Sequence, residues 1–253
     1  MSKRSFITTI KWLGSRWRAQ LFLYLFAYFA YSSTRWIVAG EVPKAMAHAQ
    51  WIDKLERSLH VSVEGPVQRA LDIGPPIWVL NHLYLIAQFA VVPGALIFLY
   101  WRAPEIYRKL RNTLFATWLI AVPIYALYPV VPPRLAGIGI IDTISDQSEA
   151  SLNSHVATSF YNPFAAVPSL HAGFAFAVGI ALAVALRHRW AKALALLWGP
   201  AVTLAVVATG NHFVFDVVAG VLVTGLGFCA ARLISGLQAR TSSHIALATG
   251  GMT

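Results

Sequence analysis

The chain has few charged residues, and acidic ones are especially scarce. Only 12% of its 253 residues are charged, whereas an ordinary soluble domain has about 25%. Hydrophobic residues make up 57%, with a mean hydropathy of +0.60, and 10 Asp and Glu stand against 20 Lys and Arg, for a net charge of +10. So small a polar fraction cannot coat a soluble core of this size. The composition therefore excludes an ordinary soluble globular protein.

Cysteine is almost absent as well. The single one, Cys229, lies inside an apolar run, so no intramolecular disulfide can form and the cysteine content does not identify a redox compartment. The basic residues do not form a soluble basic surface, which argues against nucleic-acid binding. No internal repeat or change of composition divides the chain, so we expect a single membrane domain over 1–253.

Long hydrophobic runs are what the sequence has in abundance. Each is about 18–25 residues long, enough at ~1.5 Å rise per residue to cross a hydrocarbon core of ~30 Å. We therefore predict an all-α integral membrane protein built as a six-helix bundle. The six predicted spans are 20–38, 77–101, 113–130, 170–187, 191–210 and 213–232.

The distribution of basic residues predicts how this bundle is oriented. With the N-terminus in the cytoplasm, most Lys and Arg lie on the cytoplasmic side, and of the acids only Glu105 does. Cytoplasmic loops of membrane proteins carry an excess of Lys and Arg. We therefore predict that both termini are cytoplasmic, and that the net charge reflects topology and attraction to anionic lipid headgroups. The first span has no clear cleavage site after it, so we expect it to be retained as an anchor.

The segment 39–75, between the first two predicted spans, has a different pattern. Apolar residues recur there at steps of three and four, with charged residues such as Glu56 expected on the other faces, which is typical of an amphipathic helix in a membrane interface. We expect one helix over 42–60 and a shorter one over 64–71. The first could border a lipid entrance or simply be a linker packed on the outer surface. The side chains expected to face acyl chains are Ile52, Leu55 and Leu59.

Three short polar clusters lie at the edges of the apolar runs. Ionisable groups beside hydrocarbon are costly and therefore indicate a functional site. The predicted topology brings all three clusters to the extracytoplasmic face, although six helices could have scattered them. Together they supply a guanidinium, a hydroxyl, two imidazoles and a carboxylate, a set suited to phosphate-ester chemistry. The residues that carry these groups, with a neighbouring amide, are Arg134, Ser169, His171, Asn211, His212 and Asp216.

The spacing within and between the clusters suggests a role for each residue. His212 and Asp216 are four residues apart, so they share one helical face with β-carbons ~6 Å apart. A carboxylate there fixes the imidazole tautomer and leaves the other ring nitrogen as a lone-pair donor. His171 is on a different helix and could protonate a departing alkoxide. Arg134 offers a planar fork for phosphate oxygens, and Ser169 adds a neutral donor beside the free N–H groups of a helix start.

Simpler explanations exist for several of these residues. Ser169 could only cap its helix, Arg134 could be an interfacial anchor, and the His212–Asp216 pair could be a local hydrogen bond. A zinc site made of two histidines and an aspartate is another alternative. For the protein as a whole, a lipid transporter would place its polar residues in the middle of helices. An intramembrane metallohydrolase would need a His-Glu-x-x-His pair, which the chain lacks.

The three motifs, taken in order, resemble those of a known family. Pro-Pro-Arg, then Pro-Ser-x-His opening a helix, then His-x3-Asp opening another look like the type 2 phosphatidic-acid phosphatase superfamily, which shares its core with vanadium haloperoxidases. The resemblance covers about residues 76–232. It implies a phosphoric-ester hydrolase or phosphotransferase that needs no metal or other cofactor and acts on a lipid phosphate in the bilayer. In that reading His212 forms a phosphohistidine, Asp216 orients it and His171 is the acid. The groups that would hold the phosphoryl oxygens are Arg134 and Ser169.

The chain departs from the common family pattern at two cationic positions. The lysine seven residues before the first-motif arginine is Leu127 here, and the arginine six residues before the third-motif histidine is Val206. The prolines also precede Arg134 instead of following it. The pattern is closer to the divergent branch that includes inositol phosphorylceramide synthases and bacterial relatives, so a bacterial cell membrane is expected. Head-group transfer to form a phosphodiester lipid is then the alternative to hydrolysis, and Asn211 would supply a neutral phosphate contact.

Overall fold

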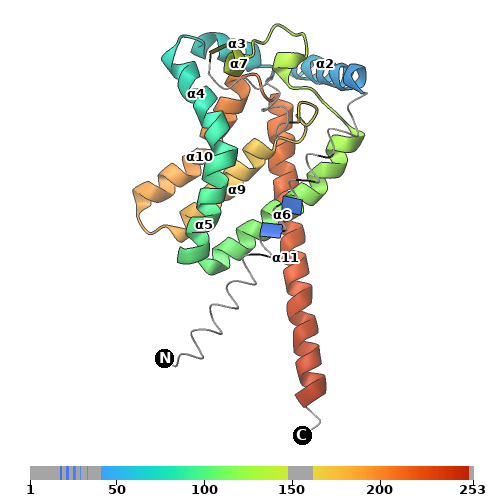
Figure 1. The fold of residues 1–253 in the computed structure, drawn as a ribbon, viewed down its shortest axis with the longest axis vertical. Helices are drawn as coiled ribbons and strands as arrows, with labels where there is room; N and C mark the ends of the chain where they lie inside the picture. Colours follow the sequence, from blue (N-terminus) through green and yellow to red (C-terminus); the bar gives the residue numbers. More distant parts are fainter. Residues whose placement is uncertain are drawn as a thin grey trace.

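The protein is described here from a computed structural model, which covers residues 41–147 and 162–250 and a few separate positions between 18 and 33. Within these residues the regular structure is helical, apart from one isolated bridge between Val130 and Ala165 (Figure 1). The all-α class that the sequence predicts is confirmed.

Four helical segments in the described part are long and apolar enough to cross a membrane. The first consists of α4 (Pro75–Ile86) and α5 (Val92–Arg102), joined without a break by the π-helical turn Ala87–Val91. The other three are α6 (Pro104–Leu127), α10 (Arg189–Ala208) and the Val214–Gly236 part of α11 (Val214–Gly250). Together they make the chain an integral membrane protein.

A fifth apolar helix, α9 (Leu170–Ala185), is shorter at 16 residues. It packs against α5, α6, α10 and α11, so most of its surface is covered by other helices. These five segments correspond to five of the six predicted spans. The remaining one, 20–38, lies almost entirely outside the described residues.

The two ends of this bundle differ in charge. At one end α5 and α6 are separated by the single residue Ala103, and Pro104 starts α6 because its fixed φ and missing N–H suit a first helical turn. Basic side chains gather near this turn, and we call it the basic end. At the other end α9 and α11 begin. The short helices α2 (Val42–Ser58), α3 (Glu64–Leu71) and α7 (Thr143–Gln147) also lie there (Figure 1). We call it the site end.

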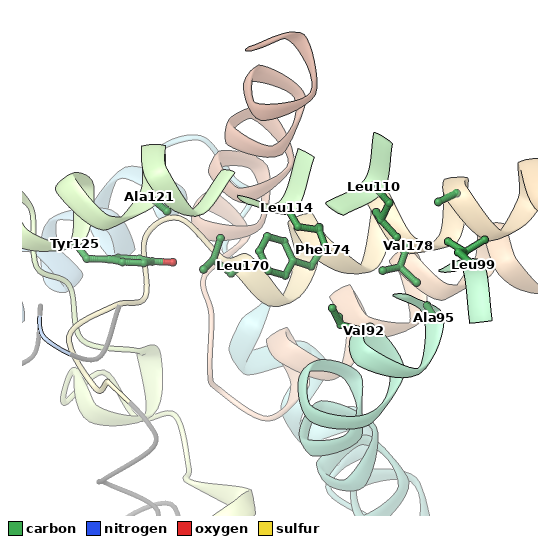
Figure 2. Close-up of a cluster of buried hydrophobic side chains, with 11 residues drawn as sticks. Val92, Ala95, Leu99, Leu110, Leu114, Ala121, Tyr125, Leu170, Phe174 and Val178 are labelled. Atoms are coloured by element: carbon green, nitrogen blue, oxygen red, sulfur yellow. The ribbon is translucent and has the colours of Figure 1, made fainter. Parts of the chain in front are cut away.

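Side chains of α5, α6 and α9 form the largest buried cluster. Phe174 lies at its centre with 1% exposure, between Leu114 of α6 and Val178 one turn further along α9 (Figure 2). The ring of Trp118 meets the Phe174 ring edge-on at 5.6 Å. Because lipid tails are as apolar as leucine, such contacts stabilise a membrane protein mainly through close packing.

Glycines bring α11 unusually close to its neighbours. A Cβ at Gly220 would collide with the backbone of Ser169, and one at Gly227 would collide with Thr117 on α6. Small residues at helix interfaces allow this approach in membrane proteins. The start of α9 is therefore held directly against the first turns of α11.

α2 (Val42–Ser58) and α3 (Glu64–Leu71) form where the sequence predicts two short helices. The predicted orientation of α2 is wrong at two positions. Ile52 is fully buried, in a cluster with Val130 and Phe213, instead of facing acyl chains. Glu56 is 2% exposed on that same buried face, because its side chain accepts the backbone N–H of Phe215 at the start of α11. Leu59, by contrast, is 61% exposed.

Candidate active site

The turn between α10 and α11 shapes the centre of the site. Gly210 has a φ of 67°, a left-handed conformation that glycine adopts readily, and a Cβ there would press on Ile140 and Arg134. The N–H groups of Asn211 and His212 both donate to the carbonyl oxygen of Val206, at 3.0 and 3.1 Å. The turn is thereby folded back on the end of α10, and His212 stands immediately before α11.

His212 and Asp216 form the expected pair. The imidazole Nδ1 lies 3.3 Å from Oδ2 of Asp216, and the same oxygen accepts the N–H of Phe213 at 2.9 Å. A hydrogen bond between these atoms places the proton on Nδ1 and leaves Nε2 with a lone pair. Burial lowers the pKa of His212 to about 3; the Ala166 carbonyl opposes this shift and the charge of Arg134 adds to it. His212 is therefore neutral, as a nucleophile must be.

His171 lies beside this pair on the first turn of α9. Its ring centroid is 5.9 Å from that of His212, with the ring planes 49° apart. The ring of Tyr84 on α4 stacks on the His171 ring, with centroids 4.4 Å apart and planes 20° apart. Among the described residues, the buried Nε2 of His171 has no hydrogen-bond partner. That nitrogen is thus available to exchange a proton with a bound substrate.

Ser169 is the N-cap of α9, as the simpler explanation predicts. Its Oγ accepts the N–H of Ala172 at 3.3 Å, and the side chain is fully buried. The N–H of Ser169 donates to the main-chain carbonyl of Asp216 at 2.9 Å, and Tyr125 donates its hydroxyl to the Pro168 carbonyl at 2.6 Å. Since capping uses Oγ as an acceptor, the hydroxyl proton can still be donated to a phosphoryl oxygen.

Arg134 is not an interfacial anchor, because its side chain is fully buried. Nη1 donates to Oδ2 of Asp142 at 2.6 Å, and Nε donates to Oδ1 of Asn211 at 3.1 Å. Asn211 is held in turn by Thr209, whose Oγ1 accepts from the amide nitrogen at 2.8 Å. Asn211 thus orients the guanidinium, and its predicted contact with phosphate remains a prediction.

Two glutamates from α2 and α3 bind the start of α11, and the sequence did not predict this role for them. Glu56 of α2 accepts the N–H of Phe215 at 2.6 Å, and Glu64 of α3 accepts that of Val214 at 2.9 Å. With Asp216 on the N–H of Phe213, three consecutive free donors of the helix start are satisfied by carboxyl groups. Burial, hydrogen bonding to Glu64 and the charges of Glu64 and Asp216 raise the pKa of Glu56 to about 8, although its bond from Phe215 opposes the shift.

The raised pKa of Glu56 predicts a pH-dependent stability. Between its ordinary pKa of 4.5 and about 8 the folded protein binds a proton that the unfolded chain does not, so stability falls as pH rises through this window. Glu56→Gln should flatten the dependence while keeping an acceptor for Phe215. We expect Tm of the wild type in detergent to drop between pH 5 and pH 9 by a few degrees more than that of the variant.

The matched control for this prediction is Asp53→Asn, which removes an acid from the same helix. Asp53 pairs with the exposed side chain of Arg57 one turn further along α2. Its pH profile should follow that of the wild type. Parallel profiles for the wild type and Glu56→Gln would show that Glu56 is ionised in the folded protein at every pH tested.

In the part of the chain that the structure describes, no group of three or more His, Cys, Asp or Glu side chains is arranged to hold a metal ion. The site comprises a buried His–Asp pair with a second histidine and a buried arginine, at one end of a bundle of apolar helices. A paired imidazole and carboxylate, a second imidazole and a guanidinium are groups that phosphoryl chemistry can use.

Comparison with known proteins identifies the family. The family model of the PAP2 superfamily matches residues 50–230, so the chain belongs to the PAP2 superfamily. Membership implies an enzyme of the phosphatase or phosphotransferase type. A search of curated proteins and a search of solved structures each found no match. The resemblance drawn from the three motifs is confirmed.

Proposed function

We propose that this protein cleaves or transfers the phosphoryl group of a lipid phosphate through a phosphohistidine on His212. The observation that carries the proposal is the neutral, buried imidazole of His212 bonded to Asp216, with the ring of His171 5.9 Å away. A nucleophile, its orienting carboxylate and a separate proton carrier are the parts that a double displacement needs. Family membership supports the type of reaction.

In the first step, Nε2 of His212 attacks phosphorus and the P–O bond to the lipid alcohol breaks. The departing oxygen takes its proton from His171, whose protonated form is favoured by the negative charge of the bound phosphate. Asp216 stabilises the positive charge that develops on His212. The phosphoryl oxygens would be held by Arg134 and the Ser169 hydroxyl.

In the second step, His171 acts as a base on the acceptor hydroxyl. The acceptor oxygen bonds to phosphorus, the P–N bond breaks, and the electron pair returns to Nε2 of His212. Water as the acceptor gives a phosphatase. Where the donor is a phosphodiester lipid, the polyol head group stays on the phosphorus bound to His212, and a second lipid hydroxyl as the acceptor gives a transferase that makes a new phosphodiester lipid. Transfer is the second candidate because two common cationic positions are apolar here: Leu127 is 77% exposed on the outside of α6, and Val206 is buried.

The test is to supply purified protein with a panel of lipid phosphates that includes inositol lipids as phosphodiester donors, with and without a second lipid alcohol as the acceptor. Release of free phosphate would identify a phosphatase, and a new phosphodiester would identify a transferase. If no lipid phosphate in the panel is consumed, or if the His212→Ala protein consumes it at the wild-type rate, the proposal is wrong.

We also propose a six-helix bundle in one membrane domain, with α2 and α3 at the interface and the site end extracytoplasmic. The convergence of Arg134, His171 and His212 at the end opposite the basic one supports this orientation. It predicts opposite labelling of single cysteines at Ser148 and Lys192, in a Cys229→Ser background, by an impermeant thiol reagent on intact cells. Ser148 should react before the cells are opened and Lys192 only afterwards. The reverse pattern would invert the topology.

A further inference from the structure

The three helices α6, α9 and α11 leave an apolar groove between them, with a volume of about 460 Å³. On α11 it is lined by Val221, Gly225 and Phe228, which are four and three residues apart and so share one helical face. On α9 it is lined by residues of one face from Gly173 to Val184. The groove thus runs along α9 and α11 towards the basic end.

Glycines determine where this groove is open and where it is closed. A Cβ at Gly225 would meet no atom within 4 Å, so the groove is open there. One at Gly173 would collide with Thr224 and the backbone of Gly220, so α9 and α11 touch at that level. His171 lies beyond this contact and packs against Tyr84 of α4. The groove is therefore separated from the candidate active site.

A second cavity of about 400 Å³ lies at the basic end, and it shares Lys109, Thr113 and Phe228 with the groove. Its charged side chains are mostly cationic, against the single acid Glu105. Glu105 forms an ion pair with Arg108, and the guanidinium of Arg232 lies 5.7 Å from the centre of the Phe228 ring. The basic side chains that line it are Arg108, Lys109, Arg111 and Arg232.

We propose that the basic cavity and the groove together bind one anionic phospholipid of the leaflet opposite the active site. Its phosphate would lie among the basic side chains, and one acyl chain would lie in the groove beside Gly225. Basic pockets between membrane helices at a membrane surface suit anionic headgroups. A second copy of the chain is a poorer occupant, because a symmetric contact would bring the same cationic cluster against itself.

The test measures binding of phosphatidylglycerol and of phosphatidylcholine with identical chains, by native mass spectrometry of the purified protein. The wild type should bind one phosphatidylglycerol more tightly than phosphatidylcholine. Each cation near a headgroup contributes roughly fivefold in affinity, so a Lys109→Gln/Arg232→Gln variant should lose about 25-fold for phosphatidylglycerol and little for phosphatidylcholine.

The groove is tested separately with Gly225→Leu, which fills open space and should abolish retention of the lipid. Gly94→Leu on α5 is the matched control, because a Cβ at Gly94 also meets no atom within 4 Å but lies outside the groove. It should bind lipid like the wild type. Equal affinity for the two lipids, or normal binding by Gly225→Leu, would overturn the proposal. So would a dimer that Gly225→Leu dissociates, since the occupant would then be a second copy.

Discussion

Replacing His212 by alanine is expected to reduce turnover at least ~10⁵-fold, as loss of a catalytic nucleophile does in comparable enzymes. The variant should fold, because a smaller side chain at this turn leaves the hydrogen bonds of its backbone to Val206 in place. The measurement is release or transfer of labelled phosphate from a lipid phosphate. In addition, the wild type should trap an acid-labile phosphoprotein during turnover, and the variant should not.

The control for this variant is His82→Ala. His82 lies on α4, where its Nδ1 is 2.8 Å from the carbonyl of Trp78 one turn earlier, and its ring packs on that of Trp78. Removing it changes a histidine without changing the site, so activity should stay within a few-fold of the wild type. A His212→Ala protein that still forms a phosphoprotein would assign the nucleophile to another residue.

Asp216→Asn is the second large effect, with an expected loss of ~10⁴-fold in turnover. An amide fills the same space, and its oxygen can still accept the N–H of Phe213, so the start of α11 should be preserved. It no longer fixes the tautomer of His212 or stabilises the charge that forms there. The loss should therefore appear in kcat and much less in KM.

Asp53→Asn again gives the matched control, since it also replaces one Asp by Asn but at a residue that pairs with Arg57 within α2. It should leave kcat unchanged. If Asp216→Asn lost less than tenfold in kcat with an unchanged Tm, Asp216 would be a structural cap of α11 and not the orienting partner of His212.

The helices could be predicted from the sequence where a property of the residues themselves defines them. Five apolar runs are helices, and α2 and α3 appear with nearly the predicted bounds. The start of α6 was placed nine residues too late, at 113 instead of Pro104, because hydropathy detects the part of a helix that lies in lipid. The turns that carry Glu105, Arg108 and Arg111 are polar and continue the same helix.

Of the site, only contacts between residues close in the sequence could be predicted. His212 and Asp216 are four residues apart, and that spacing alone places them together. Glu56 is 159 residues from its partner Phe215, and Glu64 is 150 residues from Val214. In α2 the residue spacing is compatible with two buried faces that lie side by side on the helix. One contains Leu55 and Leu59, and the other contains Glu56. Which face is buried depends on which carboxyl group accepts the N–H groups at the start of α11. No pattern within α2 contains that information.

The ion pair between Arg134 and Asp142 bears on how firmly a phosphate can be held. The side chain of Arg134 is fully buried, and its guanidinium already has an Asp142 carboxylate oxygen 2.6 Å away. A phosphate that binds Arg134 as proposed would have to share or displace a like-charged neighbour, so its binding energy would be the difference between two contacts. Under the proposed function, substrate and product would both bind less tightly for that reason. Rapid exchange at the site, more than high affinity, is what such a pair favours when the substrate is already concentrated in the bilayer.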